Sequence, residues 1–210
     1  MRILEKTERR LGTKLFLKGD RCLGPKCAMV RRAYAPGVHG SKKGGRRGKS
    51  PSEFGELIRE KQKMRFFYGL DDSDIKSYVK RASQKPGVFD AHLMRMIESR
   101  LDVVVRRLGF VPSGRAARQT VVHGHITVNG RAVRSPSYQT KKGDVIGLTE
   151  RSARTPSFAS LSERMRATTP PAWLTADPER KTGTVTGIPE RDLSAGVTFD
   201  AVKVKEFYSR

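Results

Sequence analysis

Between residues 50 and 69, apolar positions recur at intervals of three and four, the period that places one side of an α-helix in a core. Ser50 opens a capping box in which Pro51 takes the first helical position and Glu53 the third, and Gly69 closes the helix. The inward residues of this predicted helix are Phe54, Leu57, Ile58, Met64 and Phe67.

The same helical period continues to residue 98 in two further segments. Asp71 or Asp72 can cap the first segment, which ends at Lys85-Pro86-Gly87, and the second covers roughly Phe89 to Glu98. We expect the core-facing residues to be Ile75, Tyr78, Val79, Ala82, Leu93, Met94, Met96 and Ile97.

Two more helices are predicted between residues 99 and 124. Ser99 offers a cap for a helix that stops at Gly109, and Ser113 caps another that stops at Gly124. Their predicted inward residues are Leu101, Val104, Val105, Leu108, Ala116, Ala117, Val121 and Val122.

The pattern then changes to the alternation of β-strands. Ile126–Val128 and Arg131–Val133 flank Asn129-Gly130, a pair that favours the type I′ turn of a two-residue hairpin. A second turn at residues 141–144 leads into a strand over Val145–Leu148.

The two ends of the chain carry weaker signals. Residues 1–49 hold few apolar positions and are rich in Gly, Pro, Lys and Arg, so we expect an extended arm. After residue 150 we predict a short helix near 157–166, a loop over 168–178 because of three prolines, and a strand over 200–208.

Charge separates the chain into blocks. The 210 residues carry a formal net charge of +22, from 43 Lys and Arg against 21 Asp and Glu. Residues 1–65 have a net charge of +13, residues 66–99 are neutral, residues 100–154 have +8, and the remainder has +1. Two basic blocks around a neutral one indicate two contact surfaces on one anionic partner, most commonly nucleic acid.

Other classes of protein find little support. No apolar run is long enough for a spanning helix, and the N-terminus lacks the apolar stretch of a signal peptide, so a cytoplasmic protein is expected. His123 and His125 lie on one face of a strand but have no third ligand nearby, so packing or a contact to RNA is the favoured interpretation. No nucleophile–base pair or phosphate loop indicates an enzyme.

Six stretches distributed along the chain are considered together: LKGDRCLGPKCAMVRRAYAPGVHG, REKQKMRFFYGL, ESRLDVVVRRLGF, HGHITVNGRAV, PSYQTKKGDVI and the terminal EFYSR. In their order and spacing they resemble the family of small-subunit ribosomal protein S-four. The resemblance covers most of the chain and is weak between residues 152 and 182. ITVNG alone would indicate only the RNA-binding module, which other RNA-binding proteins also carry.

The resemblance implies a primary assembly protein of the small ribosomal subunit. Such a protein holds a multi-helix junction in the 5′ domain of the small-subunit rRNA, contacts ribosomal protein S-five, and lies near the mRNA entry path with a role in translational accuracy. No membrane, small-molecule substrate or enzymatic activity is expected. Two alternatives remain: a free-standing RNA chaperone or translational repressor, and an RNA-modifying enzyme that carries the module.

The chain departs from the family in two places. Many members hold zinc with two cysteine pairs near the N-terminus; here the second pair is Cys22 and Cys27, and Glu5 and Glu8 stand where the first would fall. Because structural zinc sites take Cys and His, we expect no zinc or other cofactor, and Cys22 and Cys27 as reduced thiols. Gly114 follows Ser113 where the family more often has a long basic residue, so one phosphate contact is expected to be missing.

These observations predict an α+β protein with four parts. Residues 1–49 form an extended basic N-terminal arm, and residues 50–98 a helical domain on which residues 190–210 can pack back. Residues 99–150 form the RNA-binding module, two helices packed on a short antiparallel or mixed sheet, and residues 151–189 are an irregular extension of it.

The candidate RNA contacts fall into the two basic blocks. Arginines on the first turn of a helix lie near unpaired N–H groups and form an anion site with them. In the module the candidates are Ser113, Arg115, Arg118, Gln119, His123, His125, Thr127, Asn129, Arg131, Lys141 and Lys142. In the first block they are Arg9, Arg10, Lys14, Lys18, Arg21, Lys26, Arg31, Arg32, Tyr34, His39, Lys42, Lys43, Arg46, Arg47, Lys49, Lys61, Lys63 and Arg65.

Overall fold

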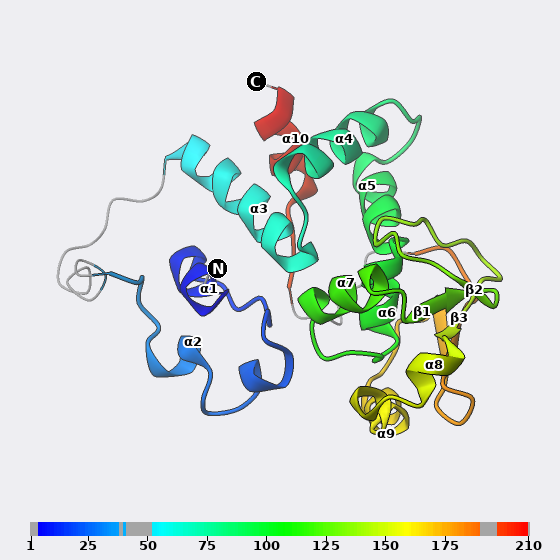
Figure 1. Ribbon diagram of the computed structural model, residues 1–210. Coiled ribbons are helices and arrows are strands. Elements are labelled where there is room, and N and C mark those ends of the chain that lie inside the picture. The colour runs from blue at the N-terminus through cyan, green and yellow to red at the C-terminus, as the bar shows by residue number, and fades with distance from the viewer. Residues whose placement is uncertain (1–3, 38–39, 41–51, 190–196, 210) are drawn as a thin grey trace. The chain divides into compact units, whose positions relative to one another are not determined.

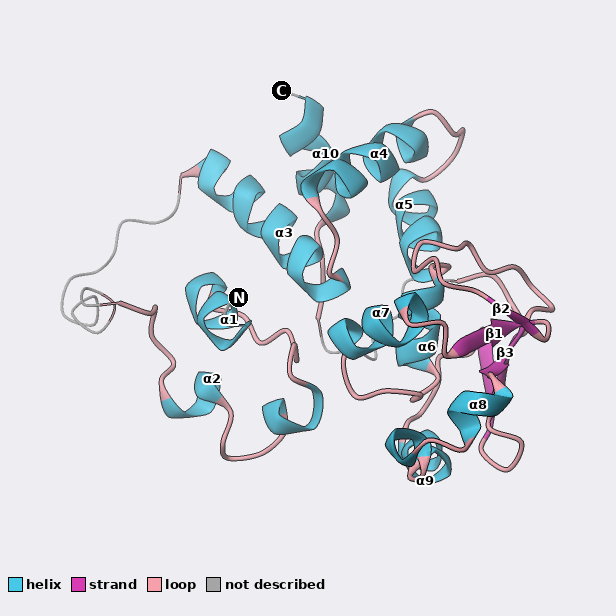
Figure 2. Ribbon diagram, viewed as in Figure 1, coloured by secondary structure: helices cyan, strands magenta, loops and turns pink. Residues whose placement is uncertain are grey.

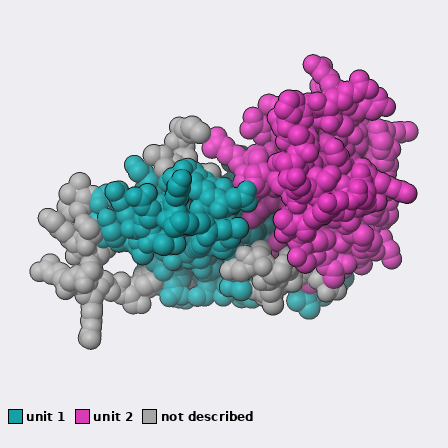
Figure 3. Space-filling model, turned by 90° about the horizontal axis from the view of Figure 1, so that it is seen from below, with its two compact units in different colours: residues 1–90, 196–210 teal, residues 91–195 magenta. Residues whose placement is uncertain are grey.

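The computed structural model describes residues 4–37, 40, 52–189 and 197–209. The chain forms two compact units: residues 1–90 with 196–210, and residues 91–195 (Figure 3). The described part of the first unit is helical, whereas all described strands belong to the second (Figure 2). The predicted α+β class is confirmed.

Two helices at the centre of the first unit begin at polar caps. Helix α3 (Glu53–Tyr68) starts after Ser52, whose hydroxyl accepts a hydrogen bond from the Gly55 amide at 3.2 Å. The prediction that Ser50 caps this helix is therefore wrong, because the N-cap is Ser52, two residues later. Helix α4 (Asp72–Ser83) is capped by Asp71, one of the two predicted cap residues, which also forms a capping box with Asp74.

Helix α10 (Ala201–Ser209) replaces the strand expected over residues 200–208. Ala201 and Val204 are buried, and Phe207 stacks on Phe54 of α3 with ring centroids 5.9 Å apart. Val202, which alternation would place inside, is exposed. The buried positions recur every three residues, so packing on α3 selects the helical period over the alternating one.

The segment before α3 is folded where it is described. It contains α1 (Leu4–Leu11), the 3₁₀ turn η1 (Gly19–Cys22) and α2 (Ala28–Arg31), and α1 contacts both α2 and α3. Leu15, Leu17, Cys22 and Cys27 are buried. The prediction of an extended arm is therefore wrong for residues 4–37, because a few buried apolar residues suffice when the buried Glu8 carboxylate binds the backbone amides of Leu15 and Leu17.

The second unit begins within α5 (Phe89–Glu98), and α6 (Leu101–Arg107) and α7 (Gly114–Val122) follow (Figure 1). Ser113 caps α7 by accepting a hydrogen bond from the Ala116 amide at 3.3 Å. Ser99 does not cap α6, because its hydroxyl donates to the Arg95 carbonyl and the helix begins after Arg100. Val122 is exposed and does not face inward as expected.

The sheet is five-stranded and antiparallel throughout, in the order β2-β1-β3-β5-β4. Strands β1 (Ile126–Val128) and β2 (Arg131–Ala132) form the predicted hairpin. Asn129 and Gly130 both adopt positive φ, 51° and 78°, as a type I′ turn requires. Strand β3 (Val145–Leu148) also lies where it was predicted.

Residues 151–189 are more regular than the expected irregular extension. They hold most of α8 (Glu150–Ala153), the turn η3 (Pro156–Phe158), α9 (Leu161–Ala167), β4 (Leu174–Asp177) and β5 (Thr182–Val185). The predicted loop over residues 168–178 is wrong because the prolines at 170, 171 and 178 flank β4 and leave its interior free to pair.

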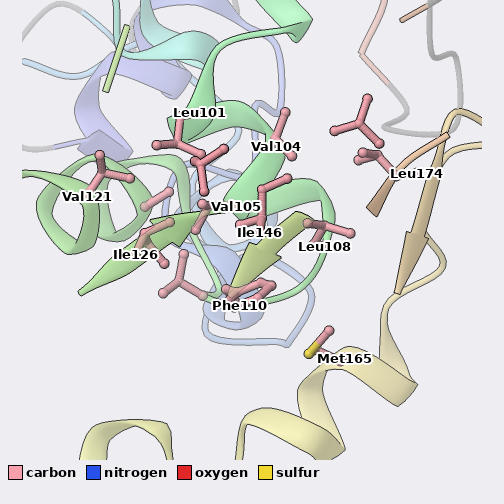
Figure 4. Close-up of a cluster of buried hydrophobic side chains, with 14 of the residues drawn as sticks. Leu101, Val104, Val105, Leu108, Phe110, Val121, Ile126, Ile146, Met165 and Leu174 are labelled. Carbon is pink, nitrogen blue, oxygen red and sulfur yellow. The ribbon is translucent and has the colours of Figure 1, made fainter. Parts of the chain in front are cut away.

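The core of the second unit lies between α6, α7, α9 and one face of the sheet. Side chains from all these elements meet in one cluster, including Leu101, Leu108, Phe110, Ile126 and Ile146 (Figure 4). A Cβ atom on Gly183 would lie 2.4 Å from a Leu108 methyl, so glycine lets α6 approach β5 closely. This cluster fixes the strands whose turns carry the candidate site.

Candidate nucleic-acid interface

Two turns of the module are fastened to each other by side chains. The Asn129 amide donates to Asp144 Oδ1 at 2.9 Å, and its Oδ1 accepts from the Val145 amide at 2.9 Å. Asp144 is buried, and its second oxygen accepts from the Lys141 amide at 2.8 Å. One oxygen of this carboxylate therefore holds the hairpin turn, and the other closes the turn at 141–144.

This fastening presents cations to solvent. We call residues 129–131 and 141–144 the turn edge. The side chains of Arg131, Lys141 and Lys142 are exposed and have no hydrogen bond or ion pair with any other described residue. Three predicted RNA contacts thus lie on these two joined turns, whereas the side chain of exposed Asn129 is engaged in joining them.

Helix α7 contributes a second cationic group. Arg115 follows the Ser113 cap on the first turn, is exposed, and has no ionic partner among the described residues. Arg118 is half exposed, and its Nη1 is buried 3.9 Å from Asp102. Asp102 already receives two hydrogen bonds from buried Arg100, at 3.0 and 2.9 Å. Part of the Arg118 charge is thus directed inward, and Arg115 is the freer of the two.

The remaining predicted contacts of the module differ in exposure. Gln119 and His123 are exposed on or next to α7, and Thr127 is half buried in the central part of the sheet. Arg134, which the sequence reasoning missed, is exposed, and its side chain lies over Gly124, where a Cβ atom would come 2.9 Å from Nε. Because a Cβ atom at residue 124 would clash with this side chain, Gly124 leaves the space that Arg134 occupies.

The two histidines do not form a reactive centre. His125 is half buried, its Nδ1 lies 2.8 Å from Ser152 Oγ, and its ring meets Phe158 edge-on at 5.6 Å between centroids. His123 is its neighbour at 5.9 Å. Within the described residues, no group of three His, Cys, Asp or Glu side chains gathers as metal ligands do. His125 therefore packs and connects β1 to α8.

In the first unit, Lys61 is a correction to the predicted surface. It is 8% exposed, its Nζ lies 2.7 Å from Asp72 Oδ1, and it sits 4.4 Å above the Phe207 ring. The Lys61 hydrogen bond holds the pKa of Asp72 below its ordinary value of 3.8. Lys61 thus connects α3 to α4 and α10, and it is a buried residue and not part of the exposed surface expected for it.

Several other predicted contacts of the first unit have internal partners. Arg9 donates Nε to the Arg32 and Tyr34 carbonyls and lies over the Tyr34 ring, which therefore packs against the chain. Lys18 and Arg21 pair with Glu5 at 3.3 and 3.1 Å. These cations help to fold residues 4–37.

The remaining members of that set are distributed as follows. Lys14 lies over the Phe16 ring, Lys63 pairs with Glu60, and Arg65 lies 4.0 Å from Asp71. Exposed cations are Arg10, Lys26, Arg31 and Arg32. His39, Lys42, Lys43, Arg46, Arg47 and Lys49 lie outside the described residues.

The residues at the family's zinc position do not fit a zinc ion. Glu8 is 1% exposed, and its Oε1 accepts from the Leu15 and Leu17 amides at 3.0 and 3.2 Å. Glu5 is engaged with two cations, so both carboxylates are already used by the protein. Burial raises the pKa of the Cys22 thiol above its ordinary value of 9.0.

Sequence reasoning missed the residues that position the site. Asp144 was seen only as part of a turn, and Arg100 and Asp102 only as parts of a helix start. Each is a buried polar residue, which a hydrophobic pattern does not reveal.

No described helix combines the length and the apolar character that a membrane crossing requires.

Comparison with known proteins agrees with this arrangement. Residues 4–98 match the ribosomal protein S4/S9 N-terminal domain, and residues 99–146 match the S4 domain. The chain is 48% identical over 202 residues to the small ribosomal subunit protein uS4 of Pelotomaculum thermopropionicum, covering 96% of this chain and 94% of the relative.

Two further relatives bear the same name. The protein of Desulfitobacterium hafniense is 46% identical over 184 residues, covering 88% of this chain and 86% of the relative. That of Thermus thermophilus is 45% identical over 203 residues, covering 96% and 94%. The helical first unit, the module in the second unit and these identities together place the chain in the family of small ribosomal subunit protein uS4.

Proposed function

We propose that this chain is a structural protein of the small ribosomal subunit and binds its rRNA through the turn edge and the first turn of α7. One observation carries the proposal. The bond between Asn129 and Asp144 fastens two turns into one edge and leaves Arg131, Lys141 and Lys142 without internal partners. Cations fixed in this way suit the phosphates and 2′-hydroxyls of folded RNA.

The charge distribution supports a polyanionic partner. The net charge of +8 over residues 100–154 is collected on a folded scaffold, so binding does not have to order these backbones first. Contacts of this kind read the shape of an RNA more than its sequence, because they reach phosphates and sugars. A structural role, without catalysis, is part of the proposal.

The family resemblance extends the proposal to finer points. The RNA target is a multi-helix junction in the 5′ domain of small-subunit rRNA, and the neighbours include ribosomal protein S-five. A position near the mRNA entry path would connect the protein to translational accuracy. A metal is not required, since Glu8 and Glu5 take part in the fold of residues 4–37 through hydrogen bonds and ion pairs.

The proposal is tested by removing the three turn-edge cations together in the full chain. The variant Arg131→Gln/Lys141→Gln/Lys142→Gln is titrated with a 5′-domain fragment of small-subunit rRNA at several salt concentrations. Each lost phosphate contact makes the slope of log affinity against log salt shallower by about 0.7–0.9, so we expect a total change of about two to three.

The control removes the same charge elsewhere. Lys76, Lys80 and Lys85 are exposed on and after α4, in the neutral stretch of the sequence. Changing all three to Gln should leave the salt slope within about half of one contact of the wild-type value. Equal losses in the two triple variants would show that net charge alone acts and would overturn the proposed site.

A further inference from the structure

The hairpin turn contains a step of the chain that is chemically labile. Asn129 is the only asparagine in the sequence and is followed by Gly130, and no Asp-Gly step occurs anywhere in the chain. Asparagine is thermolabile, because the amide nitrogen of the next residue can attack its side-chain carbonyl carbon. Glycine favours this attack, since no Cβ atom restricts its backbone. Asn129-Gly130 is therefore the step of this sequence best suited to succinimide formation.

The reaction converts an amide into a carboxylate and consumes only water. The Gly130 nitrogen forms a bond to Asn129 Cγ, the Cγ–Nδ2 bond breaks, and Nδ2 leaves as ammonia with the proton of the Gly130 amide. Water then opens the succinimide at either of its carbonyl carbons, which gives aspartate or isoaspartate at position 129. No oxidant, reductant or cofactor takes part.

The attacking group is accessible in the structure. Asn129 and Gly130 are both exposed, so water reaches them. A Cβ atom on Gly130 would meet no other atom within 4 Å, and no described group accepts a hydrogen bond from the Gly130 amide. Protection against the reaction must therefore come from the way in which the Asn129 side chain is held.

That side chain is bound at both of its polar atoms. Nδ2 donates to Asp144 Oδ1 at 2.9 Å, and Oδ1 accepts from the Val145 amide at 2.9 Å. Asp144 is 9% exposed and is itself fixed by the Lys141 amide. While both bonds persist, the side chain is not free to rotate into position for attack, so the reaction requires a local opening of the turn edge.

We propose that Asn129 is a deamidation site, that Asp144 and Val145 suppress the reaction in the folded module, and that its product separates the two turns. With aspartate at 129, a carboxylate replaces the donor 2.9 Å from Asp144 Oδ1, so two like charges face each other. Isoaspartate also adds a main-chain carbon to a two-residue turn, which changes the turn geometry. A chain that folds promptly thus keeps its amide, whereas a chain that stays unfolded loses it.

The direct test follows the tryptic peptide Gln119–Arg131 by mass spectrometry during incubation of the full chain in mildly alkaline buffer. The folded chain should deamidate at least about ten-fold more slowly than the same chain in guanidinium chloride, because two hydrogen bonds must open first. Asp144→Ala should react about two- to ten-fold faster than wild type, the factor for one lost hydrogen bond. The control Glu163→Ala, at an exposed position on α9, should match wild type. Equal rates in the folded and unfolded chains, or in Asp144→Ala and wild type, would overturn the proposal.

A second test examines the product and does not depend on how well Asp144→Ala folds. Asn129→Asp has the side chain of the hydrolysis product, and Asn129→Gly removes the same two bonds without adding a charge. Asn129→Asp should unfold at a lower urea concentration than Asn129→Gly. Adding Asp144→Asn to Asn129→Asp should recover most of the loss, because the new amide can donate to position 129 and still accept from Lys141. A double variant as unstable as Asn129→Asp would overturn the proposed repulsion.

These measurements do not depend on RNA binding, so they separate this inference from the proposed function. If the turn-edge triple variant binds RNA like wild type while folding protects Asn129, the proposed RNA site fails and the deamidation site stands. If the triple variant binds weakly while folded and unfolded chains deamidate at the same rate, only the deamidation site is removed.

Discussion

At the scale of single residues, buried polar side chains decide how the exposed cations are used. Asp144 uses one oxygen to join the two turns and the other to close its own turn, while the cations around it are exposed. Lys61 is buried and forms an ion pair with Asp72. Both are charged residues in basic surroundings, and only their burial and partners tell the scaffold residue from the contact residue.

Removing the Asp144 carboxylate should therefore cost stability as well as affinity. Asp144→Ala leaves the Lys141 amide and the Asn129 side chain without their acceptor, a loss of about 1–3 kcal/mol. Urea unfolding of the variant measures the loss. The control is Glu163→Ala, an exposed position on α9 that should change the free energy of unfolding by less than about 0.5 kcal/mol. An unchanged urea midpoint for Asp144→Ala would contradict this role.

Glu8 leads to a prediction about metal. Because its carboxylate binds two backbone amides in place of a metal, purified protein should contain far less than one equivalent of zinc, and a chelator should not shift its melting temperature. Glu8→Ala should lower the free energy of unfolding by about 1–3 kcal/mol. One bound zinc per chain, measured by atomic emission and lost together with stability on chelation, would show that this interpretation is wrong.

At the scale of elements, the sequence pattern predicted the features that are determined by residues close together in the chain. Asn129-Gly130 predicted the hairpin because few residues tolerate positive φ, and Ser113 predicted the start of α7 because a cap acts within its own turn. Helix α10 was mistaken for a strand because its period is set by burial against α3, a contact 147 residues away between Lys203 and Glu56. Strand β4 was missed because its partner, β5, lies in a weakly patterned stretch.

The close approach of α6 and β5 can be tested at one glycine. Gly183→Ala places a methyl group against buried Leu108, so we expect a loss of about 1–3 kcal/mol from overpacking. The control variant is Gly24→Ala, because a Cβ atom at residue 24 would meet open space and the backbone φ is ordinary. Gly143→Ala is not used, because Gly143 has a positive φ that would add backbone strain. Equal unfolding midpoints for Gly183→Ala and wild type would show that α6 adjusts at no cost.

The docking of α10 should depend on pH in a defined way. The Lys203 hydrogen bond lowers the pKa of Glu56 below 4.5, so its contribution is present above that pH and is lost as the pH falls through the lowered pKa. The same bond raises the pKa of Lys203 above 10.5, so the contribution of the pair is present below pH 10.5 and is lost as the pH rises through the raised pKa. Hydrogen exchange of α10 amides should be slowest, relative to Glu56→Gln, between about pH 5.5 and 9.5. An identical pH profile for wild type and Glu56→Gln would contradict the role of the pair.

At the scale of the whole molecule, the charge blocks of the sequence correspond to folded surfaces. The +8 block forms the module with its turn edge, and the neutral block supplies α4 and most of α5. The described part of the first basic block is folded rather than extended, since Glu5 and Glu8 pair with its cations and amides. Composition predicted the kind of partner, but long-range pairs decided which cations remain available, and no sequence pattern shows those pairs.

The central claim is that cations fixed on a folded scaffold bind small-subunit rRNA. The most direct measurement is a titration of the full chain with the 5′-domain fragment between about 50 and 200 mM salt, with an unrelated structured RNA of equal length as competitor. We predict a log–log salt slope of about −3 or steeper and binding that survives an excess of the competitor. A slope near zero, or complete displacement by an equal amount of the competitor, would contradict the account.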